Sequence, residues 1–220
     1  MLNSNTKKYF VLIVLFVFPV FIYLFFASGK NNFALLPILS EDINEISSWD
    51  SLSGDIIKFE DHISILGFWG DDVINKKTEA LNLNQKIYKR FYEFNDFQFI
   101  IVLLEGQEKE IENLKNKLKE GVGTDLVKWK FIFGSSEEIN NLFNSLKTPF
   151  NLSNSDSTPL VFIIDKEKNL RGRDDDDKGI LFGFNAQSVA EINNKMVDDV
   201  KIILAEYRLA LKKNDSLFNE

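Results

Sequence analysis

Two kinds of hydrophobic pattern alternate along this chain. Continuous apolar runs at 62–69 (HISILGFW) and 97–104 (FQFIIVLL) have the length and composition of strands that are buried on both faces. Between and after these runs, apolar residues recur at helical spacing among polar ones, which predicts helices with one buried face. The alternation of strand and helix predicts a parallel sheet, because parallel neighbours need a crossover connection.

The remaining elements follow from shorter signals. A helix opens at Asp71 and Asp72 and ends at the break at 95–96. Two later helices begin with capping boxes, in which Ser135 precedes Glu138 and Ser188 precedes Glu191. Another polar helix follows residue 104. The further predicted strands are a short pair around 56–59, a strand at 129–133, and a hairpin formed by 158–165 and 170–173.

The N-terminus carries an uncharged apolar run at 9–27, after a polar stretch at 1–8 that contains Lys7 and Lys8. A helix of roughly 19 apolar residues is long enough to cross the hydrocarbon core of a bilayer. The paired lysines predict a cytoplasmic N-terminus and an exported domain. The alternative is a cleaved signal peptide, but the run is longer than such a peptide usually has, and 27–29 (ASG) is a poor cleavage site. We therefore expect a retained anchor.

These signals divide the chain into five parts. We expect a cytoplasmic segment at 1–8, a transmembrane anchor at 9–27, a spacer and leading segment at 28–53, one domain at 54–213 and a tail at 214–220. Within the spacer, residues 33–39 should be extended around Pro37 and should pack along an edge of the domain.

Composition excludes several classes of function. The chain has 220 residues, with 26 basic against 33 acidic side chains, which argues against a nucleic-acid surface. It has no cysteine and a single histidine, His62, so disulfides, thiolate metal sites, thiol catalysis and a lipid-modified cysteine are all excluded. We expect no cofactor.

Four groups of side chains have both a functional and a structural interpretation. His62 can bind a metal weakly or relay a proton, but a lone histidine at a strand start is more often a structural residue that takes a hydrogen bond. Asp71 and Asp72 can act as an acid/base pair, although helix capping alone explains them. The run 174–177 (DDDD) can gather Ca²⁺, but without the spacing of a calcium loop we expect a solvated loop. The aromatic residues are expected mainly in the core rather than in an exposed patch; they are Phe91, Tyr92, Phe94, Phe97 and Phe99.

From about residue 52 to 213 the sequence resembles the Sco/SenC family of membrane-anchored copper and redox proteins that serve assembly of cytochrome c oxidase. The resemblance is carried by the anchor, by ILGFWGDD, by WKFIFGSSEEINNLF and above all by STPLVFIIDKEKNLRG. It implies an α/β fold, a thioredoxin-like sandwich with a central mixed sheet and flanking helices, which also fits the order of the predicted elements. It further implies a cis-proline at Pro159.

The departures from the family decide the expected chemistry. The family places a C-x-x-x-C pair just after the first core strand, where this chain has Asp71 and Asn75, and its histidine ligand falls at about Ser157. Cu(I) prefers thiolate and imidazole donors, and disulfide exchange needs sulfur, so neither activity is carried over. This makes the chain a degenerate member that lacks the Cys pair and the His ligand.

We therefore expect a noncatalytic binding or assembly factor, without redox or copper chemistry. It should be a single-pass protein of a bacterial inner membrane, with a periplasmic domain and an envelope or membrane protein as partner, such as part of a respiratory oxidase or of another envelope complex. The alternative is a carboxylate-based metal-binding protein or a hydrolytic enzyme on the same fold.

Overall fold

The computed structural model describes residues 4–27, 35–122, 125–177 and 179–218, and the chain forms two compact units, Met1–Ala34 and Leu35–Glu220. The first unit contains one helix, α1 (Ser4–Ala27). Its 18-residue window Lys8–Phe25 has a mean hydropathy of 2.4, so this helix is long and apolar enough to cross a membrane. The predicted anchor at 9–27 thus lies within one continuous helix.

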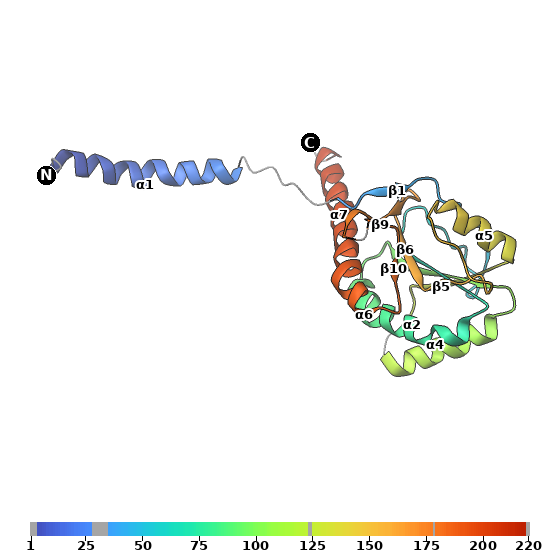
Figure 1. Cartoon of the computed structure of the whole chain (residues 1–220). Coiled ribbons are helices and arrows are strands. Elements are labelled where there is room, and N and C mark those ends of the chain that lie inside the picture. Colours follow the sequence, from blue (N-terminus) through green and yellow to red (C-terminus); the bar gives the residue numbers. More distant parts are fainter. Residues whose placement is uncertain (1–3, 28–34, 123–124, 178, 219–220) are drawn as a thin grey trace. The chain divides into compact units, whose positions relative to one another are not determined.

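The second unit is built around a mixed sheet (Figure 1). The strand order is β1-β7-β6-β3-β4-β5-β2, and β10 also pairs with β6. The parallel neighbours are β3 with β4 and β4 with β5, as the alternating pattern predicts, whereas the outer strands are antiparallel. The strands of this sheet are β1 (Ile38–Ser40), β2 (Asp50–Ser51), β3 (Ile63–Gly70), β4 (Phe97–Leu104), β5 (Trp129–Gly134), β6 (Leu160–Ile164), β7 (Leu170–Arg171) and β10 (Phe184–Asn185).

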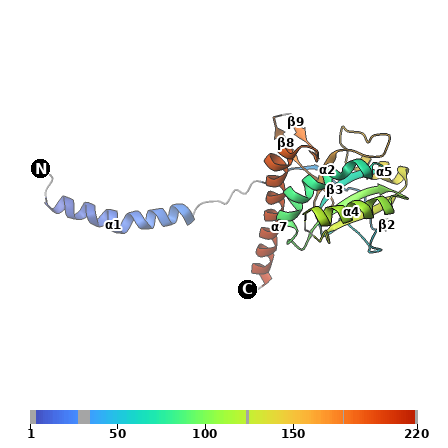
Figure 2. The same ribbon diagram turned by 90° about the horizontal axis from the view of Figure 1, so that it is seen from below.

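Helices cover both faces of this sheet, with α2, α4 and α7 on one face and α5 on the other (Figures 1 and 2). The helical segments after β3 are η1 (Val73–Lys76, 3₁₀), α2 (Lys77–Leu83), η2 (Asn84–Tyr88, π) and α3 (Lys89–Phe91). The others are α4 (Glu108–Val122), α5 (Ser136–Ser145), α6 (Val189–Glu191), η3 (Ile192–Met196, π) and α7 (Val197–Phe218). Because α7 reaches Phe218, it includes most of the predicted tail.

Strand β3 shows why its sequence is apolar throughout. Ile65 and Trp69 point into the core beneath α2 and α7, whereas Leu66 and Phe68 point into the core beneath α5. All eight residues of β3 are buried. A strand covered on both faces has no position for a solvated polar side chain, which explains the continuous run.

The leading segment belongs to the domain. Strand β1 pairs with β7, and β2 pairs with β5, so both outer edges of the sheet come from residues before 54. Leu36, Ile43 and Ile46 are also buried in the core. The compact unit therefore begins at Leu35, earlier than the predicted domain start at residue 54; residues 28–34 of the predicted spacer lie outside the described residues.

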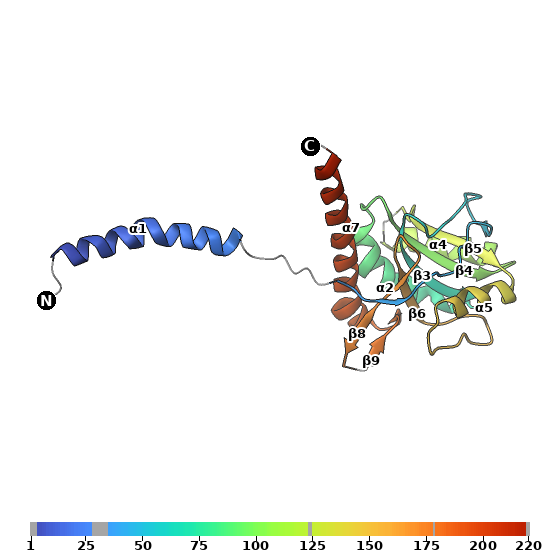
Figure 3. The same ribbon diagram turned by 90° about the horizontal axis from the view of Figure 1, so that it is seen from above.

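Three local expectations need correction. Residues 56–59 form no strand; instead the Phe59 N–H donates to the Glu45 side chain. Residues 174–177 are not a plain loop, because β8 (Arg173–Asp176) and β9 (Gly179–Leu181) form a separate two-stranded sheet, which is clearest in Figure 3. Of the aromatic residues, Tyr92 and Phe94 are exposed, while the other three are in the core as expected.

The predicted capping box of α5 is present, and it supports a stability prediction. The Ser135 hydroxyl accepts a hydrogen bond from the Glu138 N–H, and the Glu138 carboxylate accepts one from the Ser135 N–H at 2.8 Å. The Ser135 N–H and the Ser135 hydroxyl, which also donates to this carboxylate at 2.7 Å, lower the pKa of Glu138. We expect Ser135→Ala to lower the free energy of unfolding by about 1 kcal/mol and to raise the pKa of Glu138, measured by urea titration and by NMR pH titration. An unchanged Glu138 pKa would contradict the assignment.

Candidate functional site

The candidate site lies where β3 ends and the first helical segment begins. Gly70 has a φ of +50°, and the Ser155 carbonyl oxygen lies 1.9 Å from the position that a Cβ atom would occupy. The next residue, Asp71, donates its N–H to that same carbonyl at 3.2 Å. Only glycine fits this close approach, and the segment 153–157 is thereby held against the end of β3.

The three positions that the resemblance aligns with the family's ligands, Asp71, Asn75 and Ser157, are all at this end of the sheet. The Asp71 side chain is exposed, and Asp71 lies beside Ser155, two residues from Ser157. The Ser157 hydroxyl is 3.0 Å from the Ser153 hydroxyl, and Asn75 donates to Asp72 Oδ1 at 2.6 Å. The fold brings the segments together, but the Asn75 and Ser157 side chains form hydrogen bonds within their own turns, and the Asp71 side chain is exposed.

Two expectations about this end are wrong. The N-cap residue Asp72 makes no side-chain capping bond, because its carboxylate accepts from the Asn75 side chain instead. The Thr158–Pro159 bond is trans, since the described residues contain no cis peptide bond. In the trans form Thr158 donates its N–H to the Phe68 carbonyl and Pro159 accepts from the Ala186 N–H, so the backbone polar groups are satisfied in the isomer that X–Pro bonds normally prefer.

A buried ion pair, which the sequence pattern did not reveal, lies inside this end. The Lys76 amine donates to Glu79 Oε1 at 3.1 Å, and only 4% and 2% of these side chains are exposed. Lys76 also donates to the Thr158 carbonyl at 3.3 Å, and Gln187 donates to the same Glu79 oxygen at 3.0 Å. The pair therefore joins the first helical segment to the Thr158–Pro159 segment and to the residues that precede α6.

Comparisons place this architecture among solved structures. Neither a family model nor a curated protein matches the sequence. BsSco, a member of the Sco family of cytochrome c oxidase assembly proteins, superposes with a TM-score of 0.51 at 13% identity, over 76% of this chain and 95% of its own. The fold is thioredoxin-like.

Two further structures agree with this assignment. A proposed protein disulfide isomerase from Bacteroides thetaiotaomicron has a TM-score of 0.51 at 12% identity, over 78% of this chain and 95% of its own. A proposed electron transport protein from Aquifex aeolicus has a TM-score of 0.50 at 15% identity, over 77% and 98%. At these identities the likeness establishes the fold of the thioredoxin-like domain, while its chemistry has to be argued from its own residues.

The electrostatics of the buried pair suit a structural role. Burial raises the pKa of Glu79 above 4.5, although Lys76 and Gln187 oppose this shift. The second carboxylate oxygen of Glu79 is buried and has no hydrogen-bond partner among the described residues. In the thioredoxin-like domain this carboxylate and amine are thus enclosed by protein and face one another, so neither is presented to a substrate.

The other candidate residues also take structural positions. The His62 ring nitrogen lies 2.8 Å from the Glu60 carbonyl oxygen, which is the hydrogen bond that the structural interpretation predicts. Within the acidic run, Asp176 pairs with Lys195, while Arg173 beside it binds Asp199 through contacts of 2.7–3.0 Å. Among the described residues, no group of three or more His, Cys, Asp or Glu side chains is arranged to hold a metal ion.

A cleft of about 290 Å³ opens beside η1. Val73 and Leu114 line it together with the exposed side chain of Ile74, and its polar lining includes Lys77 of α2 and Lys117 of α4. Ile74 is 82% exposed. The thioredoxin-like domain therefore presents an apolar side chain and a cleft beside η1, which begins two residues after Asp71.

Proposed function

We propose that this protein is a membrane-anchored, extracytoplasmic, noncatalytic member of the thioredoxin-like fold, which binds another envelope protein during assembly of a complex. The observation that carries the proposal is the buried Lys76–Glu79 pair, because it is a charged pair next to Asn75, a position where the resemblance places reactive sulfur, and it is enclosed by protein. Thiol–disulfide exchange needs an attacking thiolate and a sulfur leaving group, and the chain has no cysteine.

The partner class is proposed by analogy. BsSco is named as a member of a family of cytochrome c oxidase assembly proteins, and it shares this fold. We infer a partner in a respiratory oxidase or in another complex of the bacterial inner membrane. The surface that we assign to this partner is the cleft beside η1, since it brings the apolar side chains of Val73, Ile74 and Leu114 together with lysines of α2 and α4.

Affinity purification with two matched variants tests the binding function. The tagged full-length protein is crosslinked in intact membranes, solubilised in detergent and recovered with its partner. Ile74→Asn is expected to reduce recovery of the partner at least several-fold, whereas Ile56→Asn, at a site that is 79% exposed and outside this cleft, should leave recovery unchanged. Failure to recover any reproducible partner would overturn the proposal.

The absence of native cysteine makes the topology directly testable. Single cysteines are introduced by Ser4→Cys before the apolar run and by Asn144→Cys on α5, and intact cells are treated with a maleimide that cannot cross membranes. We expect labelling at position 144 without permeabilisation and at position 4 only after it, because the lysines before the run favour a cytoplasmic N-terminus. The reverse pattern would contradict the extracytoplasmic placement.

A further inference from the structure

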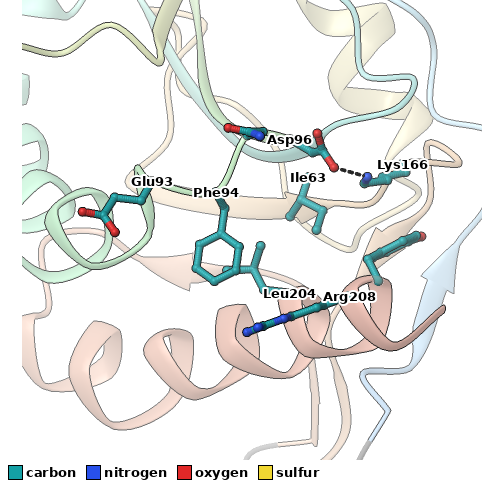
Figure 4. Close-up of a pocket in the computed structure, with 9 residues that line it drawn as sticks. Ile63, Glu93, Phe94, Asp96, Lys166, Leu204 and Arg208 are labelled. Atoms are coloured by element: carbon teal, nitrogen blue, oxygen red, sulfur yellow. Dashed lines mark hydrogen bonds and ion pairs between the residues drawn. The ribbon is translucent and has the colours of Figure 1, made fainter. Parts of the chain in front are cut away.

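A second cleft, of about 310 Å³, lies at the other end of the sheet from the candidate site (Figure 4). It opens where β3 and β4 begin, beside α7. Ile63, Phe94 and Leu204 supply its apolar lining, and Lys166, Tyr207 and Arg208 line it from the β6–β7 turn and from α7.

The rim of this cleft combines aromatic side chains with cations. Phe94, which lines the cleft, is exposed, and the half-buried Tyr207 lines it from α7. Arg208 makes no ion pair among the described residues, and Lys128 donates to the carbonyls of Phe94 and Asn95. Two acidic side chains near the cleft already have partners. Asp96 pairs with Lys166, and Glu167 accepts a hydrogen bond from the Tyr207 hydroxyl. Figure 4 shows that the Glu93 carboxylate extends away from the Phe94 ring.

The cleft is next to the point where the polypeptide enters the domain. Arg171 is buried; it donates to the Leu36 carbonyl at 2.8 Å and to the Glu206 carboxylate at 2.6 Å. Glu206 immediately precedes the cleft residues Tyr207 and Arg208. The first residues of the domain are thus fastened beside this part of α7.

The linker is short. Residues 28–34 separate the apolar helix from Leu35, and a stretch of that length spans at most about 25 Å when fully extended. If the helix is held in a membrane, as in the function proposed above, on which this inference rests, the surface around Leu36 has to stay close to the lipid headgroups. Exposed aromatic rings together with arginine and lysine are the side chains that favour that interface.

We propose that the surface formed by Phe94, Tyr207 and Arg208 rests on the headgroup region of the same membrane, with a lipid phosphate at Arg208 and the aromatic rings at the headgroup–acyl boundary. This contact orients the domain, so that the cleft beside η1, at the other end of the sheet, faces away from the bilayer and toward a partner.

Fluorescent labels on single cysteines test this contact in the full-length protein in nanodiscs that contain anionic phospholipid. Glu93→Cys reports on the cleft, Asn144→Cys reports on α5, and Phe16→Cys reports on the apolar helix. Helix α5 lies on the opposite side of the domain from α7 in all three views (Figures 1–3). Quenching by nitroxide-bearing lipids is expected to be strong at position 16 and several-fold stronger at 93 than at 144.

Substitutions in the Glu93→Cys background show which residues make the contact. Quenching at position 93 gives the ratio of domains that rest on the lipid to domains that do not. Arg208→Gln should lower this ratio about fivefold, as expected for one basic residue near an anionic surface. Phe94→Ser should also lower it, whereas Lys201→Gln, at an exposed α7 residue outside the cleft, should not. Equal quenching at positions 93 and 144, or no effect of Arg208→Gln and Phe94→Ser, overturns the proposed membrane contact. If quenching at position 16 is strong in the same experiment, the membrane anchor still stands. No quenching at 16 overturns the anchor as well.

Discussion

Replacing Lys76 by methionine is expected to lower the free energy of unfolding of the domain by about 3–5 kcal/mol. This is the usual cost of removing one partner of a buried ion pair, because the other charge stays buried without compensation. Here Glu79 is 2% exposed, and one of its oxygens already lacks a partner among the described residues. Urea titration followed by the fluorescence of the buried Trp69 and Trp129 measures the loss.

The double variant Lys76→Met/Glu79→Leu is the control. Replacing a buried ion pair by apolar side chains of similar volume is often neutral or stabilising, so the double variant should recover most of the loss.

The free energy of unfolding of the single variant Lys76→Met should also depend on pH. Since burial raises the folded-state pKa of Glu79 above 4.5, the unfolded chain gives up this proton first, and stability falls as the pH rises from about 4.5 through the folded pKa. A loss in Lys76→Met that is independent of pH would contradict this account.

Removing residues 35–53 is expected to abolish folding of the domain. This segment supplies the edge strands β1 and β2, and it buries Leu36, Ile43 and Ile46. Burial of a large aliphatic side chain contributes about 1.5–3 kcal/mol, so these three account for about 5–9 kcal/mol. The net stability of a domain is only about 5–15 kcal/mol.

Two fragments make the comparison. The fragment 30–220 keeps the whole compact unit and should fold as a soluble domain, whereas 54–220 should lack a cooperative unfolding transition by circular dichroism and should be degraded rapidly by protease. Equal melting temperatures of the two fragments would show that residues 35–53 do not contribute to the stability of the domain.

The central strands could be predicted from the sequence because their environment leaves few options. Strands β3 and β4 are covered on both faces, so their continuous apolar runs mark them almost to the residue. The start of α5 can also be predicted from the sequence, because Ser135 and Glu138 form a capping box that depends on no distant residue.

Elements that depend on distant partners were not predictable in this way. Strand β2 has only two residues and exists because β5 lies beside it. The acidic run after Arg173 becomes a β-hairpin rather than a solvated loop, since Asp199 and Lys195 from the last helical segments pair with residues of β8.

The same reason explains what was missed at the candidate site. Lys76 and Glu79 are three residues apart on a helical segment, a spacing that normally indicates a solvated ion pair. They are buried because Thr158 and Gln187, which are far away in the sequence, close over them. The family resemblance points to positions 71, 75 and 157, but a resemblance locates segments and does not predict the hydrogen bonds that Asn75 and Ser157 make.

The backbone packing at Gly70 restricts which residue a homologue can carry at this position. A methyl group at this position would overlap the Ser155 carbonyl, and the left-handed backbone there disfavours any other residue. A distant homologue that keeps this packing must therefore carry glycine at the equivalent position, whichever residues follow it in the first helical segment. This glycine, followed by a lysine and a glutamate spaced as Lys76 and Glu79 are, is the signature by which homologues that share this packing can be recognised.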